Sequence, residues 1–321
     1  MTMAIAHRPL DSVATSGVAR ARAWRPFPRD AADVLCVDEP AGTVQPRMHG
    51  RFALMLVRSP AVVRAESSRS VVADRSSILL VPAWQLYALR ALGEAPQGAV
   101  TLLLGASHVA GLGAVDRPAL VTDAELGARV AALVAQLRRP VRPVECAVMI
   151  RPVLERLAVR GTPTAATRPR RAVAPLGPVR DYLRARLGEP VTTAELARLS
   201  GLTEWHLIRA FHREYGLPPH AYHTRLRLAA ASELLSDGLG VSTAAYECGF
   251  ADQSHLSRKF KEVYGLTPAA WAGAAAAHGP RHGAPADALR TVARRGAPAS
   301  RTRHSLTIAP LVRRGADNDH R

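Results

Sequence analysis

Hydrophobic positions divide this chain into two parts with different periodicities. In the first part, short apolar or alternating runs are separated by polar or Gly/Pro-containing stretches, the pattern of strands in a small antiparallel barrel or sandwich. These runs cover residues 52–57, 61–65, 77–82, 86–91 and 100–104. Beyond residue 178, apolar residues instead recur every three or four positions, as on the buried face of a helix. The sequence therefore predicts a two-domain α+β protein, with an N-terminal antiparallel β barrel or sandwich and a C-terminal all-α domain.

A helical hairpin is expected between these two parts. Thr122 and Glu125 have the spacing of a capping box, which opens a helix. An apolar stripe follows at Leu126, Val130, Leu133 and Leu137. A second helix is expected over 145–159, with the turn supplied by residues 139–143. The stripe either packs on the barrel or pairs two copies of the chain, so a homodimer is one expected assembly.

The all-α part begins with two short helices joined by a sharp turn. Thr192 and Glu195 form a capping box, and Gly201 supplies the left-handed turn that ends the helix. Thr203 caps the next helix, in which Leu207, Ala210 and Phe211 face inward. The opposite face mixes apolar, aromatic and cationic groups, at Trp205, Ile208, Arg209 and His212. An ordinary solvated face would seldom combine them, so this face is predicted to make contacts.

The same arrangement follows again about fifty residues later. Val241, Ala244 and Ala245 lie on a first helix that Gly249 ends, and Asp252 caps the next helix, whose core face is Leu256, Phe260 and Val263. Hydrogen-bonding groups then project outward, at Gln253, Ser254, Arg258 and Lys261, with His255 at the edge. Arginine pairs with guanine and glutamine with adenine through two hydrogen bonds each, and apolar groups such as Ile208 and Trp205 contact thymine methyl groups. Two helix-turn-helix units that read the major groove are predicted.

These residues resemble the DNA-binding domain of AraC/XylS-type transcription regulators. The stretch 249–261 with Thr267-Pro268 is similar to that family's second recognition helix, and 193–211 to the first unit. The intervening spacing of Tyr222, Arg227-Leu228, Ala231 and Leu234-Leu235 is that of the helix joining the two units. The resemblance covers about 178–272. It implies double-stranded DNA as partner, read as a bipartite site in two adjacent major grooves about 34 Å apart. It also implies a cupin-like sensor domain for a small-molecule effector, helices that pair subunits, and activation through RNA polymerase.

Each proposed DNA contact also has a structural interpretation. Arg209 and Arg258 fit surface arginines or phosphate contacts as well as base contacts, and the same choice holds for His212 and His255. Trp205 fits a packing residue, although its position away from Leu207 favours a phosphate or base contact. The tandem arrangement favours DNA contact.

Charge alone does not locate the DNA-binding part. The net charge is +17, yet residues 178–275 hold eleven Arg and Lys against ten Asp and Glu, and residues 276–321 hold nine Arg against three Asp. The predicted division is a poorly ordered N-terminus over 1–30, a cupin-like sensing and dimerisation domain with the helical hairpin over 31–160, and a flexible linker over 161–177. The tandem helix-turn-helix domain follows over 178–275, then a basic disordered tail over 276–321. The linker is expected to let the DNA-reading half reorient.

Other classes of function are less consistent with the residues. Three scattered cysteines do not form a disulfide framework, and neither a membrane span nor a signal peptide is predicted, so a cytoplasmic, nucleoid-associated protein is expected. His49 and His108 stand alone, so neither a metal site nor a cofactor is expected. A cupin-type metalloenzyme fused to a DNA-binding domain and a non-specific architectural DNA binder remain alternatives. Trp84 and Tyr87, with Phe52 or Met55, line a small pocket or form ordinary core.

Overall fold

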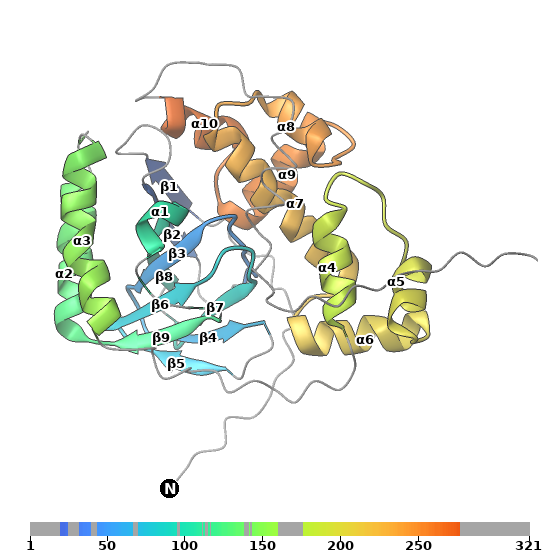
Figure 1. Ribbon diagram of the computed structural model, residues 1–321, viewed down its shortest axis with the longest axis horizontal. Coiled ribbons are helices and arrows are strands. Elements are labelled where there is room, and N and C mark those ends of the chain that lie inside the picture. Colours follow the sequence, from blue (N-terminus) through green and yellow to red (C-terminus); the bar gives the residue numbers. More distant parts are fainter. Residues whose placement is uncertain are drawn as a thin grey trace, which may run out of the picture.

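The computed structural model describes residues 20–24, 32–39, 44–66, 70–94, 97–110, 112, 115, 117–137, 141, 143–159 and 176–276. Its first part holds two antiparallel sheets (Figure 1). The larger has the order β1 (Arg20–Trp24), β2 (Ala32–Glu39), β8 (Gln97–Leu104), β3 (Phe52–Val57), β6 (Ser77–Val81) and β9 (Ala119–Thr122). The smaller has the order β5 (Val71–Ala73), β4 (Ala61–Ala65) and β7 (Tyr87–Ala91). The predicted antiparallel β domain is confirmed, as two separate sheets and not as a closed barrel.

The larger sheet is buried on both faces, and successive side chains of its strands enter two different apolar clusters. In β3, Leu54 belongs to the apolar cluster beneath helices α2 (Ala124–Gln136) and α3 (Pro143–Val159), whereas Met55 belongs to the cluster shared with the smaller sheet. Leu102 and Leu103 of β8 alternate in the same way, as successive side chains of a strand must. Phe52 lies on the α2–α3 side, away from Met55, Trp84 and Tyr87, so these four candidates do not line one pocket. All four are buried core residues.

The helical hairpin forms as predicted, with one correction at its start. The predicted stripe of leucine and valine is buried beneath the hairpin. However, Thr122 is the last residue of β9, and the residue that caps α2 is Asp123, whose carboxylate accepts from the amides of Glu125 and Leu126. A carboxylate one position later reaches the free amides of the first turn, so the Thr122–Glu125 capping box was the wrong assignment.

Helices α4 (Gly177–Ala185) to α10 (Pro268–Ala276) form the second part, built around α7 (Pro219–Ser236). The other members are α5 (Thr193–Ser200), α6 (Glu204–Tyr215), α8 (Val241–Glu247) and α9 (Gln253–Tyr264). Leucines and alanines of α7 are fully buried on all sides of the helix, including Leu226, Ala230 and Leu234. Because α7 is enclosed, it fixes how the helices before and after it are placed.

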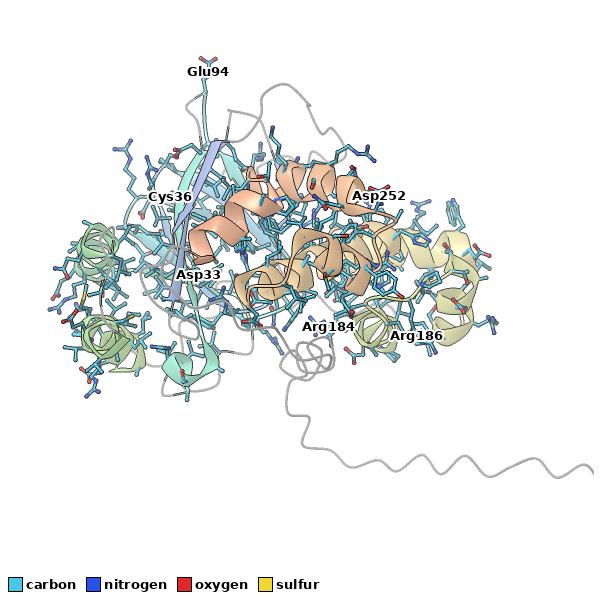
Figure 2. The ribbon with its side chains drawn as sticks, turned by 90° about the horizontal axis from the view of Figure 1, so that it is seen from above. Asp33, Cys36, Glu94, Arg184, Arg186 and Asp252 are labelled. Carbon is cyan, nitrogen blue, oxygen red and sulfur yellow. The ribbon has the colours of Figure 1, made fainter. Side chains whose placement is uncertain are left out.

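The two parts pack directly on each other. Figure 2 views this arrangement from above, with Asp33 of β2 labelled on the sheet domain and Asp252, at the start of α9, labelled on the helical domain. Arg51 is paired with Asp33 of its own domain and, at 3.0 Å, with Glu233 of α7. The apolar cluster on the inner face of the sheets continues into the helical part. Any reorientation of the two parts therefore has to break buried contacts.

The segments expected to be disordered or flexible are described only in part. Strand β1 lies inside the range 1–30, for which the sequence predicts no order. Residues 160–175 of the expected linker and 277–321 of the expected tail lie outside the described residues. In the described part, no helix combines the length and the apolar composition needed to span a membrane.

Candidate nucleic-acid interface

The two helix-turn-helix units are a structural repeat. α6 and α9 each have 12 residues, each ends at a tyrosine, and each is followed by a left-handed glycine, Gly216 or Gly265. Each also begins at a side-chain cap: Thr203 accepts from the amide of His206, and Asp252 from the amide of His255. The predicted caps of both recognition helices are confirmed. The repeat makes Arg209 equivalent to Arg258, and Tyr215 equivalent to Tyr264.

The structure places the side chains of α6 that were predicted to read DNA on its outer face. Trp205 is 59% exposed and Ile208 is 38% exposed, whereas Leu207 and Phe211 are fully buried. The guanidinium carbon of Arg209 lies 4.4 Å from the Trp205 ring centroid. This cation–π contact holds the arginine against the tryptophan and leaves both on the surface. His212, one turn further along, is half-buried.

On α9, both donors and acceptors of hydrogen bonds are exposed. Gln253, Ser254, Arg258 and Lys261 are exposed and His255 is half-buried. Lys259 is neutralised by Glu262 at 2.9 Å. Arg258 and Lys261, by contrast, form no ion pair with any described residue, so their charges are available to a phosphate or a base.

The sequence reasoning missed two exposed side chains of these units. His206 is exposed, with its ring centroid 4.9 Å from that of Trp205, and the repeat aligns it with the predicted contact His255. Aligning the two caps, Thr203 and Asp252, would have identified it. Tyr246 of α8 is 81% exposed. The helix is too short for its apolar periodicity to predict which side chains are exposed.

The turns of the two units differ in how tightly they are enclosed. Gly201 and Gly249 both have positive φ, at 67° and 71°, which explains why the sequence has glycine at both positions. A side chain added at Gly201 would meet nothing within 4 Å, whereas one added at Gly249 would lie 2.6 Å from the carbonyl oxygen of Gly188. The second turn therefore needs glycine for space as well as for backbone conformation.

Metal binding has no support in the described residues, where no three His, Cys, Asp or Glu side chains converge. Burial and the adjacent Arg47 and Arg51 lower the pKa of His49 to about 3. These two guanidinium groups disfavour the binding of a metal cation beside His49. His108 lies on the short helix α1 (Ala106–Val109), and its pKa is lowered by partial burial.

Two exposed recognition helices on a shared buried helix define a tandem helix-turn-helix protein of the DNA-binding class. A family profile described as a helix-turn-helix domain matches residues 196–274. The uncharacterized HTH-type transcriptional regulator YbfI of Bacillus subtilis is 38% identical over 76 residues, which are 24% of this chain and 28% of that protein. The HTH-type transcriptional activator AarP of Providencia stuartii is 32% identical over 88 residues, 27% of this chain and 65% of AarP.

A solved structure is similar to about a third of this chain. It is a probable AraC family transcriptional regulator from Rhodopseudomonas palustris, 32% identical, with a TM-score of 0.30, covering 31% of this chain and 95% of that one. The chain therefore carries an AraC-type helix-turn-helix domain over residues 196–274. It spans 28% of YbfI and 65% of AarP, and both similarities cover about a quarter of this chain.

Proposed function

We propose that this protein is a sequence-specific transcription regulator that reads a bipartite DNA site with α6 and α9. The observation that supports this most directly is the equivalence of the two helices, which have the same length, the same capping and exposed candidate contacts in the first two turns. Major-groove readers place their base contacts in those turns. The proposed contacts are Trp205, Ile208, Arg209 and His212 on α6, and Gln253, Ser254, His255, Arg258 and Lys261 on α9.

Competition binding tests sequence specificity. In this assay the full chain is mixed with a selected operator and with excess bulk DNA, at a stated near-physiological salt concentration. A sequence-specific regulator retains its operator, because specific sites bind roughly 10³-fold or more tighter than bulk DNA. Arg186→Ala should retain the operator as wild type does and serves as the control. Arg186 lies outside both helix-turn-helix units and pairs with Glu189 at 2.8 Å. Equal displacement by operator and bulk DNA would instead support an architectural binder.

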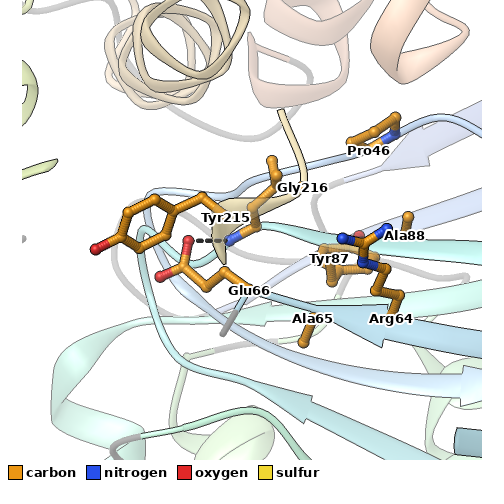
Figure 3. Close-up of a pocket in the computed structure, with 9 residues that line it drawn as sticks. Pro46, Arg64, Ala65, Glu66, Tyr87, Ala88, Tyr215 and Gly216 are labelled. Atoms are coloured by element: carbon orange, nitrogen blue, oxygen red, sulfur yellow. Dashed lines mark hydrogen bonds between the residues drawn. The ribbon is translucent and has the colours of Figure 1, made fainter. Parts of the chain in front are cut away.

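The proposal divides the chain as the sequence suggests, with residues 31–160 sensing an effector and pairing subunits, and residues 178–275 binding DNA. Effector control is supported by the direct packing of the two parts. A narrow cleft, with room for no more than about one water molecule, lies where they meet, between Arg64, Glu66, Tyr87, Tyr215 and Gly216 (Figure 3). An effector that binds the sheet domain and changes how this domain holds the recognition helices would shift the population competent to bind both half-sites.

Activation through RNA polymerase belongs to the same proposal and is supported by the relative AarP, which is named an activator. Transcription from an operator-linked promoter measures it, with and without a candidate effector. If an effector saturates the protein and leaves operator affinity, dimerisation and transcription unchanged, effector control is wrong, while DNA reading stands.

A further inference from the structure

Both recognition helices end against the sheet domain, at equivalent positions of the repeat. Tyr264, the last residue of α9, is fully buried, and its hydroxyl donates to the carbonyl of Met48 at 2.7 Å. Tyr215, the last residue of α6, is 5% exposed and lines the cleft with Glu66 of the sheet domain. Each helix thus exposes its first turns and has its last turn held by the other domain.

An arginine of the sheet domain lies at each of these helix ends. Arg47 donates from Nε to the carbonyl of Val263 at 2.9 Å, and the Arg64 guanidinium lies beside Gly216, which follows α6. A cation at the C-terminal end of a helix interacts favourably with the helix dipole and with carbonyls that lack a helical partner. A sheet-domain arginine therefore lies near the C-terminal end of each recognition helix, and Arg47 and Arg64 come from different segments.

The contact with α9 is buried and electrically balanced. Arg47 is 4% exposed and forms an ion pair with Glu39 of β2, which is 1% exposed. The neighbouring segment also receives a hydrogen bond from α7, from Arg225 Nε to the carbonyl of Pro46 at 2.8 Å. Breaking one partner of such a network leaves a buried charge or carbonyl without a partner. The segment from Pro46 to Met48 consequently ties α7 and α9 to the sheet domain at once.

We propose that the sheet domain fixes the orientation of α9 relative to α6, and that Arg47 and Tyr264 are positioning residues for reading the second half-site. The inference rests on the proposed bipartite reading of DNA. A single base pair added between two half-sites turns one about 34° around the DNA axis relative to the other. Because the sheet domain holds α9 at its C-terminal end, α9 cannot turn with a half-site that has rotated about the DNA axis. The intact protein therefore discriminates between operators of different spacing.

The test is a set of operators in which one base pair is added or removed between the two half-sites. The full wild-type chain is expected to lose about ten-fold or more in affinity at either altered spacing. Tyr264→Phe removes the hydroxyl that bonds to Met48 and that also interacts with Ser232 of α7. We expect its loss to fall to about three-fold, with base preference inside each half-site unchanged. The double variant Glu39→Gln/Arg47→Met, which removes both charges together, should behave in the same way.

His223→Gln is the matched control. His223 is buried on α7, and its Nε2 lies 3.0 Å from the carbonyl oxygen of Arg186, inside the helical domain. It should keep the wild-type spacing profile at a similar loss of stability. If both α9-contact variants also keep that profile, the positioning role is wrong and the bipartite reader stands. If wild type itself shows no base-specific or spacing-dependent binding, both the proposed function and this inference are wrong.

A measurement without DNA checks the same point. Spin labels at Arg213 and Glu262, equivalent exposed positions of α6 and α9, report the distance between the readers in the full chain with Cys36 replaced by serine. The distance distribution is expected to be narrow in wild type and His223→Gln, and broader in Tyr264→Phe. Equal widths in all three would overturn the inference.

Discussion

Acidification should weaken the packing of the sheet domain on α9 through His49. This imidazole is 2% exposed, its Nε2 lies 2.9 Å from the Tyr87 hydroxyl, and its ring centroid is 5.7 Å from that of Tyr264. Burial, and then the charges of Arg47 and Arg51, lower the pKa of His49 to about 3 from the ordinary 6.5. The folded protein therefore keeps His49 neutral at pH values where the unfolded chain protonates it.

The sign and size of the effect follow from that difference. Between about pH 6.5 and pH 3 the unfolded state binds more protons, so the free energy of unfolding falls as the pH falls. Each pH unit in that window is worth about 1.36 kcal/mol, so acidification from roughly pH 7.5 to 4.5 removes about 3 kcal/mol. Burial raises the pKa of Glu66 and of Glu233, whose contributions have the opposite sign.

Urea unfolding of wild type and His49→Gln at both pH values isolates the His49 contribution, because glutamine does not titrate and retains a partner for the Tyr87 hydroxyl. The loss on acidification should be about 3 kcal/mol smaller in His49→Gln than in wild type. His223→Gln tests the same sign inside the helical domain: burial lowers the pKa of His223 to about 4, so this variant should also lose less stability than wild type on acidification. Equal acid losses in wild type and His49→Gln would refute the reasoning.

Three further predictions concern single positions. Arg209→Ala should weaken operator binding by about 1–3 kcal/mol and relax preference at one base pair, as binding-site selection would reveal; an even loss on all sequences would mean a phosphate contact. Asp123→Ala should lower the free energy of unfolding by about 1 kcal/mol or more, whereas Thr122→Ala should change it by less than about 0.5 kcal/mol; the reverse order in urea unfolding would restore the threonine cap. Gly249→Ala should destabilise the protein by more than about 2 kcal/mol and Gly201→Ala by about 1 kcal/mol, because only the former meets the Gly188 carbonyl; thermal unfolding compares them, and equal losses would contradict the close approach.

The helical domain was predictable because its signals are local. Thr192, Thr203 and Asp252 cap helices through amides three residues away, and Gly201 follows directly after the helix it ends. Strands β3 and β4 were predicted with their observed bounds, because their apolar runs are bounded by polar or turn-forming residues. Such features need no knowledge of the rest of the chain.

Strand β2 and the packing of the two domains were not predictable in this way. Asp33 and Glu39 interrupt the apolar pattern of β2, and each is buried only because an arginine elsewhere neutralises it. In the domain contact, Arg47 bonds to a carbonyl 216 residues away and Tyr222 bonds to Glu66 across 156 residues. A charged residue whose partner is that distant has the sequence signature of a surface residue.

Selection of bound sites from random DNA with the full chain, at near-physiological salt, tests the central claim most directly. Two short motifs about one helical turn apart are predicted, with preference relaxed at one base pair of the first in Arg209→Ala and at one base pair of the second in Arg258→Ala. A single motif, or recovery of DNA without any shared sequence, would contradict reading by two recognition helices.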